Sequence, residues 1–186
     1  MKSRIFQTAL ALVLILSCQK EKKQNPFEIS INRIGLLTNE IPINKLDSIF
    51  ANDSIAKSSP DNKLLGTTNE IEIYEKGGAK LLVLEPKKDT DVSSTIGNIQ
   101  VIDPRYKTAS GLSSNSTFKD IKEQYNVSKI NNTLSTAVIF VDSLQAYFTI
   151  DKKELPEKFK FNTDSKIEIS DIPDTARIKH FWLQWE

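Results

Sequence analysis

Few residues of this 186-residue chain are suited to catalysis, since it has one cysteine, Cys18, and one histidine, His180. A single imidazole cannot build a histidine-rich metal site, and no cysteine–histidine dyad is expected. No GxGxxG, P-loop or HExxH motif occurs, and the serines have no histidine in a context that suggests a triad. We therefore predict no enzymatic activity, no cofactor and no metal, and a structural role for His180 within a strand.

Two further groups of residues could bind a ligand. The loop Ser113–Asn115 precedes a predicted helix and could hold an anion through free backbone amides. Turn formation and helix capping are the alternative, favoured because Leu37–Asn39 occupies an equivalent place upstream. Trp182 and Trp185 could form a binding patch, although aromatic residues of a strand more often belong to the core.

The strongest functional signal lies at the N-terminus. Lys2 and Arg4 precede an apolar stretch, residues 5–16, that is too short to span a bilayer as a mature helix. It ends in Ile15-Leu16-Ser17-Cys18, which resembles a bacterial lipobox with an aliphatic residue at −3, a small one at −1 and cysteine at +1. The resemblance predicts a signal peptide at 1–17 and lipidation of Cys18, including palmitate. An ordinary secretory signal and an anchor helix are the alternatives.

A lipidated Cys18 would make the membrane a partner of the protein. Residues 18–26 are polar and charged and predict a tether. Gln19, at +2, is not the aspartate that retains enteric lipoproteins in the inner membrane, so by that resemblance we expect the outer membrane, on its periplasmic or surface side. Removing Lys2 and Arg4 with the signal lowers the basic count from 25 to 23, against 24 acidic residues. Without a basic excess, nucleic acid is not an expected partner.

A succession of structural signals runs from residue 106 to 151. Phe118, Ile121 and Tyr125 recur at the spacing of one helix face, and Thr117 with Asp120 three residues later predicts an N-terminal cap. Two apolar runs follow, at 135–141 and 144–150, with the turn residues Asp142-Ser143 between them. The pattern predicts a short helix followed by a β-hairpin.

A fainter copy of this pattern begins near residue 33. Gly35 stands 76 residues before Gly111, Ile43, Leu46 and Phe50 repeat the helix spacing, and runs at 70–74 and 80–84 predict a second hairpin. We infer two related strand–short helix–β-hairpin units at about 27–86 and 96–151. Two unrelated amphipathic segments remain the alternative.

The chain from 27 to 186 therefore predicts one α+β domain built on an antiparallel sheet. The alternating residues 27–34 predict a strand, and the polar residues 52–69 predict a loop. Near the C-terminus, strands are expected within 159–186, at 159–162, 166–169 and 178–185.

Asp-Ser or Asp-Thr followed by an apolar residue occurs four times, ending at Ile49, Ile55, Leu144 and Ala176. The pattern resembles the O-glycosylation motif of envelope proteins in Bacteroidetes, and a high content of lysine, asparagine and isoleucine suits such an origin. Ser54, Ser143 and Thr175 are the predicted sites, because Ser48 falls inside a predicted helix. Caps and turns are the alternative use of these pairs.

Three segments resemble a known family. They are T-A-S-G-L-S-S-N-S-T-F-K-D-I-K-E-Q-Y, V-D-S-L-Q-A-Y-F-T-I and I-P-D-T-A-R-I, and with the lipobox they are similar to the uncharacterised bacterial lipoproteins grouped with the enterobacterial RpoE-regulated lipoprotein. That family implies no activity. A more distant similarity to β-lactamase-inhibitor and outer-membrane assembly lipoproteins implies protein binding.

The leading hypothesis is thus a membrane-anchored, non-enzymatic envelope lipoprotein that binds an unknown protein or other envelope component. The alternative is a small-ligand or lipid carrier with a pocket between helices and sheet.

Overall fold

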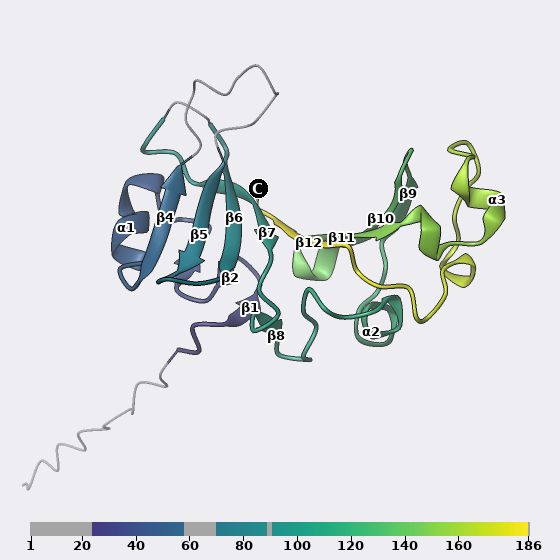
Figure 1. Cartoon of the computed structure of the whole chain (residues 1–186), viewed down its shortest axis with the longest axis horizontal. Coiled ribbons are helices and arrows are strands. Elements are labelled where there is room, and N and C mark those ends of the chain that lie inside the picture. Colours follow the sequence, from purple (N-terminus) through teal and green to yellow (C-terminus); the bar gives the residue numbers. More distant parts are fainter. Residues whose placement is uncertain (1–23, 58–69, 89–90, 186) are drawn as a thin grey trace, which may run out of the picture.

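The computed structural model describes residues 24–57, 70–88 and 91–185, which form two sheets and a few short helices (Figure 1). The larger sheet has eight strands in the order β4-β5-β6-β7-β12-β11-β10-β9, with every neighbouring pair antiparallel. Its strands are β4 (Asp53–Lys57), β5 (Ile71–Glu75), β6 (Lys80–Pro86), β7 (Ile96–Val101), β9 (Lys129–Asn132), β10 (Thr136–Val141), β11 (Ala146–Asp151) and β12 (His180–Gln184). Mostly antiparallel strands with few helices agree with the predicted α+β class.

The smaller sheet has the order β3-β2-β1-β8. Three of its strands precede the first helix in the chain, and the fourth follows β7. Its strands are β1 (Glu28–Ser30), β2 (Arg33–Ile34), β3 (Leu37–Thr38) and β8 (Lys107–Thr108), and β8 runs parallel to β1. The single strand predicted over 27–34 is wrong, because the chain reverses between β1 and β2 with Asn32 at a φ of 58°. Ile31 at this turn is 59% exposed and takes no part in the core.

The two predicted helices are present. The first comprises η1 (Ile43–Lys45) and α1 (Leu46–Ile49), and the second is α2 (Phe118–Gln124). The spaced apolar residues of both bury their side chains, which is why such short helices persist. These residues are Ile43, Leu46, Phe50, Phe118 and Ile121.

The predicted cap of α2 is confirmed. The backbone N–H of Thr117 donates to the Asp120 carboxylate at 2.7 Å, and the Thr117 hydroxyl donates to the same oxygen at 2.9 Å. Aspartate therefore serves in the capping box at a position that glutamate and glutamine usually occupy.

Both predicted hairpins are also confirmed. β10 pairs with β11 across η3 (Asp142–Leu144), and β5 pairs with β6 across the turn that contains Gly77. In the second case Gly77 supplies the positive φ, 73°, that the turn needs.

Two predictions outside these units are wrong. Residues 159–162 do not form a strand, because Pro156 precedes helix α3 (Glu157–Lys160) and its fixed φ suits a helix start. Residues 166–169 are not a strand either, and η5 (Ile169–Asp171) begins at their end. The loop predicted from residue 52 contains the edge strand β4, whereas 58–69 lie outside the described residues. The prediction for 178–185 holds, since β12 lies between β7 and β11.

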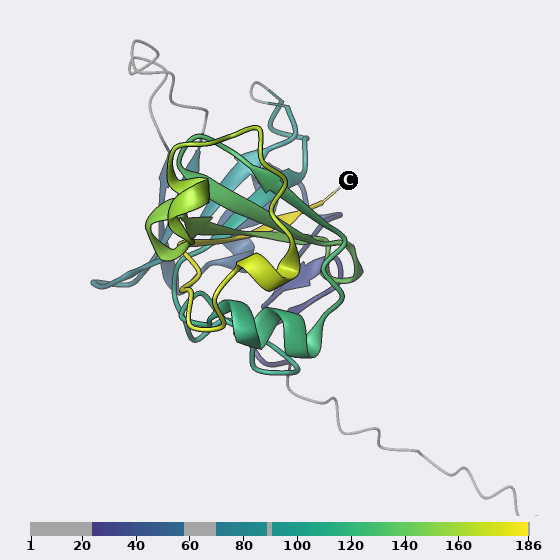
Figure 2. The same cartoon turned by 90° about the vertical axis from the view of Figure 1, so that its right-hand side faces the viewer.

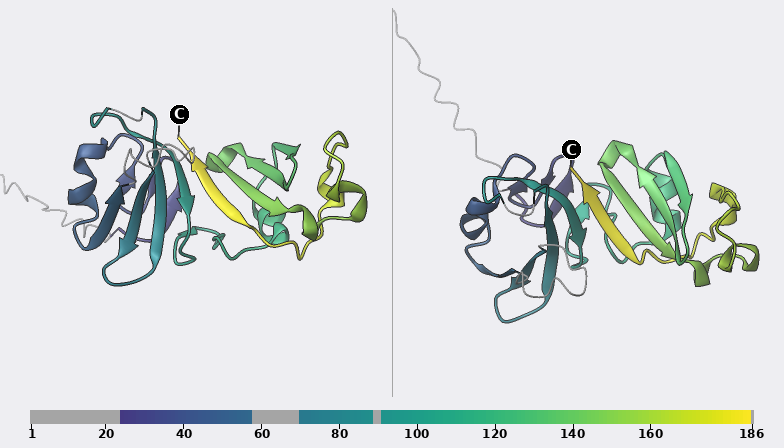
Figure 3. Two further views of the ribbon diagram at one scale, coloured as in Figure 1. Left: turned by 45° about the horizontal axis from the view of Figure 1, so that its top comes forward. Right: turned by 90° about the horizontal axis from the view of Figure 1, so that it is seen from above.

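Each half of the large sheet follows a helix. α1 is followed by β4, β5, β6 and β7, and α2 by β9, β10, β11 and β12. The halves meet where β7 pairs with β12, near the middle of the long axis (Figure 3). The predicted hairpins are thus parts of two four-stranded antiparallel arrays, while the duplication itself stays a prediction.

One core cluster contains residues from both helices, both sheets and the C-terminal segments, among them Phe118, Phe148, Phe159 and Phe181. The view along the sheet shows α2 on one side of the strands (Figure 2). Among the described residues no helix has the length and apolar character needed to cross a membrane.

Candidate functional site

The register of the large sheet separates its side chains into two faces, since directly paired residues share a face. One row lies on the core side and is almost fully buried: Ile73, Leu82, Val101, Phe181, Phe148 and Ile139. The alternating row lies on the opposite side, which we call the open face: Glu72, Val83, Gln100, Trp182, Tyr147, Phe140 and Lys129. Most of these side chains are only partly buried.

Three aromatic side chains form a ladder across the open face. The Tyr147 and Trp182 rings are nearly parallel, 8° apart, with centroids 5.9 Å apart, and the Phe140 and Tyr147 centroids are 5.8 Å apart. The ammonium of Lys129 lies 5.8 Å from the Phe140 centroid at the end of the ladder. Tyr147 and Trp182 are therefore stacked on each other, and Phe140 is tilted against Tyr147.

Partial burial also sets the chemistry of the Tyr147 hydroxyl. Burial, together with the negative charge of Glu85, raises the pKa of Tyr147 to about 12. Glu85 itself accepts a hydrogen bond from the Asn98 amide at 2.9 Å. Tyr147 therefore stays neutral at physiological pH and can donate a hydrogen bond at the surface.

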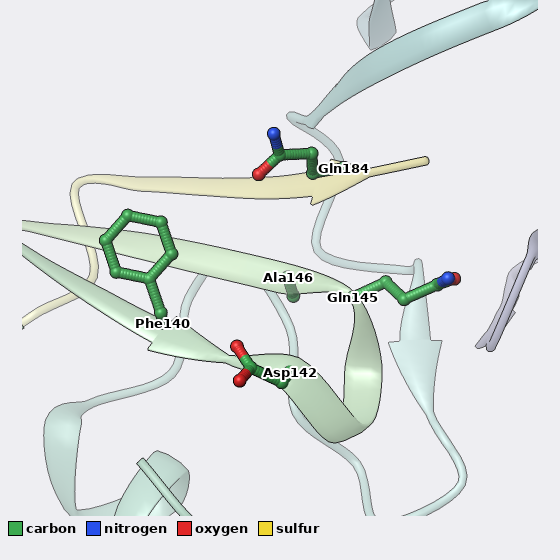
Figure 4. A pocket seen from close by; sticks show the side chains of 5 residues that line it. All are labelled: Phe140, Asp142, Gln145, Ala146 and Gln184. Atoms are coloured by element: carbon green, nitrogen blue, oxygen red, sulfur yellow. The ribbon is translucent and has the colours of Figure 1, made fainter. Parts of the chain in front are cut away.

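A depression of about 310 Å³ lies beside the ladder, next to the connection between β10 and β11. Figure 4 shows Phe140 and Gln184 on one side of the strands, with the Asp142 carboxylate beside them and Gln145 at the turn into β11. Ser128 donates to the Asp142 carboxylate at 2.7 Å, which holds that acceptor in place.

A second depression, of about 430 Å³, lies over β7 and β12. Its lining brings together two groups that the sequence singled out, the Ser114–Asn115 loop and His180, and includes Gln100. The His180 Nδ1 lies 3.0 Å from the Thr149 hydroxyl on the neighbouring strand. His180 thus has the predicted strand position and a side-chain partner.

The environment of His180 predicts a pH effect. Burial, and then the positive charge of Lys179, lowers the pKa of His180. The unfolded chain, with a histidine pKa of about 6.5, binds the proton more readily than the folded one. This stabilising contribution is present above pH 6.5 and is lost as pH falls through the folded pKa. NMR titration should place the midpoint of His180 below 6.5, and His180→Gln should remove this part of the pH dependence of unfolding. An unshifted midpoint would contradict the prediction.

The anion-binding hypothesis for Ser113–Asn115 finds no support in the structure. The first-turn amides of α2 are already bonded, Phe118 N–H to the Ala176 carbonyl at 2.8 Å and Lys119 N–H to the Asp174 carbonyl at 3.1 Å. Ser114 donates to the Ile102 carbonyl at 2.9 Å. The loop serves the turn and docks the helix, as the alternative stated.

The remaining predicted sites are dispersed. Ser54 lies on β4, Ser143 within η3 and Thr175 in the turn before β12, all exposed, so glycosylation at them stays a prediction. Cys18 lies outside the described residues. The two tryptophans differ, since Trp185 is buried in the core and Trp182 stands on the open face.

One charged cluster, on the other half of the molecule, could not be predicted from the sequence. Arg105 pairs with Glu75 and Asp103, both at 2.8 Å, and its guanidinium lies 4.7 Å from the Phe27 ring centroid. Burial, with the nearby Glu75 charge, raises the pKa of Asp53. Because the partners come from β5, the turn after β7 and the start of the small sheet, we assign this cluster to fixing those elements together. No group of acidic, histidine or cysteine side chains suited to a metal occurs among the described residues.

The fold and site define a class: an α+β domain in which a long antiparallel sheet is covered on one face and carries aromatic residues on the other. A solved structure, that of the uncharacterized protein yfeY from Escherichia coli, shares the fold with a TM-score of 0.50 at 13% identity. The similarity covers 85% of this chain and 99% of that one. No family model and no curated protein matches the sequence. Because the neighbour is enterobacterial, the finding agrees with the sequence resemblance at the level of fold, while membership of the family and an origin in Bacteroidetes stay predictions.

Proposed function

We propose that this protein is a non-enzymatic lipoprotein of the bacterial envelope, anchored by Cys18 to the outer membrane, whose open face binds a partner protein. The observation that carries the proposal is the partly exposed ladder of Phe140, Tyr147 and Trp182. Large aromatic residues are enriched among the residues that dominate protein–protein binding energy.

The surroundings of the ladder support a protein partner over a glycan. A sugar ring stacks on a free aromatic face, and the stacking of Tyr147 on Trp182 leaves less ring face free than an isolated aromatic residue would offer. Hydrogen-bonding groups border it on both sides, Asn98 and Gln184 in one row and His180 in the other. An apolar centre with a polar rim is the usual composition of a protein interface, and the two depressions can receive side chains of the partner.

The carrier alternative, which needs a pocket between helices and sheet, has less support in the described part of the chain. A hollow lies between Phe27 of the small-sheet segment, Phe50 at the end of α1 and Leu81 of β6, and its volume is about 80 Å³. That volume corresponds to two or three water molecules, far below the several hundred Å³ of a typical ligand site.

We also propose that the two halves arose by duplication. The supporting observation is that α1 and α2 each precede four sequentially antiparallel strands. Gly35 and Gly111 add to it, because both have positive φ values, 56° and 90°.

Truncation of the ladder tests the proposed surface. A photo-reactive amino acid at Gln100 should cross-link a discrete protein in living cells, and Trp182→Ala should weaken binding by at least 2 kcal/mol, about 30-fold. Phe161→Ala is the matched control, since it removes an aromatic residue that is 92% exposed and lies elsewhere. Equal cross-linking by wild type and Trp182→Ala, or equal losses in both variants, would refute the assignment.

A further inference from the structure

β9 forms one edge of the eight-stranded sheet, and part of its backbone faces outward. Thr133 N–H donates to the Thr136 carbonyl at 3.0 Å and Ser128 N–H to the Phe140 carbonyl at 2.9 Å. The carbonyls of alternate β10 residues therefore point at β9. Val138 is one of these residues, and its partner Asn131 turns its backbone N–H and C=O toward β10. Since backbone direction alternates along an antiparallel strand, Ile130 turns its N–H and C=O away from β10. A strand edge of this kind can pair with another chain.

A groove runs beside this edge. One wall is Val127–Ile130 and the other is Lys166–Ile169, and the volume between them is about 340 Å³. Ile167 is buried beneath it, and Ile169 is 43% exposed. The segment that forms the outer wall is held to the edge strand farther along, where the Asn132 amide donates to the carbonyls of Asn162 at 2.9 Å and Ser165 at 2.8 Å. The groove thus has one fixed end and an apolar wall next to the unpaired backbone of Ile130.

The charges at the groove differ between its two sides. Lys166 is paired with Glu168 at 2.7 Å. Lys129 is exposed, its ammonium lies over the Phe140 ring, and no ion pair of Lys129 occurs in the described part of the chain. Because Lys129 points to the open face and Ile130 to the groove, an added strand would meet a cation on one of its faces and apolar side chains on the other.

We propose that this groove binds an extended peptide segment of a partner protein, which adds to β9 as a ninth strand. The segment places apolar side chains on the Ile130 side and a carboxylate beside Lys129. Backbone hydrogen bonds supply affinity and the alternating side chains supply specificity. The inference goes beyond the proposed function, because peptide addition at β9 does not depend on the ladder.

Blocked nonapeptides that alternate valine with aspartate are the probe, measured by fluorescence anisotropy on the full-length chain in detergent. In an antiparallel pair only every second N–H of the peptide faces β9. N-methylation of one alternating set of amides should therefore abolish binding, whereas methylation of the other set should leave it within about twofold. A scrambled peptide of the same composition should bind at least tenfold more weakly than the parent.

Two protein variants locate the site. Ile130→Pro removes the outward N–H without a bond to β10 being lost, and such a proline is tolerated on an edge strand; it should weaken the peptide at least tenfold. Lys129→Glu, on an exposed side chain, should weaken the aspartate peptide and strengthen its lysine counterpart. Trp182→Ala should change neither, which separates this site from the aromatic ladder.

Three binding results would overturn the proposal. The first is equal binding of both N-methylated series, the second is no preference for the parent over the scrambled peptide, and the third is no exchange of preference in Lys129→Glu. Sedimentation showing a dimer that Ile130→Pro dissolves would also overturn it, because β9 would then pair with a second copy of the chain.

Discussion

Replacing Gly35 by alanine is expected to destabilise the protein by about 2–5 kcal/mol. Gly35 has a φ of 56°, in the left-handed region that side chains disfavour, and an added Cβ would lie 2.3 Å from the Pro26 carbonyl oxygen. The contact is with backbone, so no side chain can rotate away. The carbonyl of Gly35 also accepts hydrogen bonds from Gln24 at 2.9 Å and Arg33 at 3.1 Å. Urea and thermal unfolding should show a fall in melting temperature on the order of 10 °C.

Gly111→Ala is the matched control, since Gly111 also has a positive φ, 90°, but nothing lies within 4 Å of its Cβ position. It should cost only the backbone term, about 1–2 kcal/mol. The difference between the free energies of unfolding of the two variants measures the cost of the clash with Pro26, whose carbonyl lies against the turn between β2 and β3. Equal losses of stability in the two variants would show that the contact between Pro26 and the β2–β3 turn does not constrain the small sheet.

Local sequence predicts several features of this fold. The hairpin turn at Gly77, the capping pair of Thr117 and Asp120, and the two apolar runs around Asp142-Ser143 are all decided within about ten residues. Each of these expectations is confirmed by the structure. The prediction of a single strand over 27–34 was wrong even though it is also a local feature, because the alternation of apolar residues does not indicate that the chain reverses at Asn32.

Pairing between distant segments could not be predicted in this way. β12 is the last strand of the chain, yet it joins the two halves of the sheet by pairing with β7 and β11. Alternation along residues 178–185 predicts a strand with two apolar faces but not its neighbours. β8, which pairs in parallel with β1 about 80 residues earlier, gave no strand signal because it has only two residues.

The open face was missed for a related reason. Phe140 and Tyr147 lie in the two runs of the predicted hairpin, but a two-residue turn at Asp142-Ser143 would pair Phe140 with Gln145. The actual connection, residues 142–145, is two residues longer and places Phe140 opposite Tyr147. Trp182 comes to stand beside Tyr147 only when β12 pairs with β11. A pattern of apolar residues on both faces of a strand is typical of burial, and only the tertiary arrangement shows which of the two faces is left uncovered.

Lipidation of Cys18 is the prediction with the largest expected effect, because a single substitution should remove all of the attached lipid. In cells of the native host, the wild-type protein should incorporate labelled palmitate and begin at residue 18, whereas Cys18→Ala should incorporate none. Membrane fractionation alone is not decisive, since an uncleaved precursor would keep the apolar residues 5–16 and could stay membrane-associated through them. The intact mass is the better measurement, because it distinguishes a cleaved, acylated chain from a precursor.

Ser17→Ala is the control for Cys18→Ala, because it keeps a small residue at −1 and should leave processing unchanged. Gln19→Asp asks a further question at the +2 position: in a host that follows the enteric sorting rule, it should move the acylated protein from the outer to the inner membrane. A wild-type protein without palmitate, or one that begins at a residue other than 18, would contradict the anchor. The open face would then belong to a protein that is secreted or anchored in another way, and the polar segment 18–26 would need another explanation.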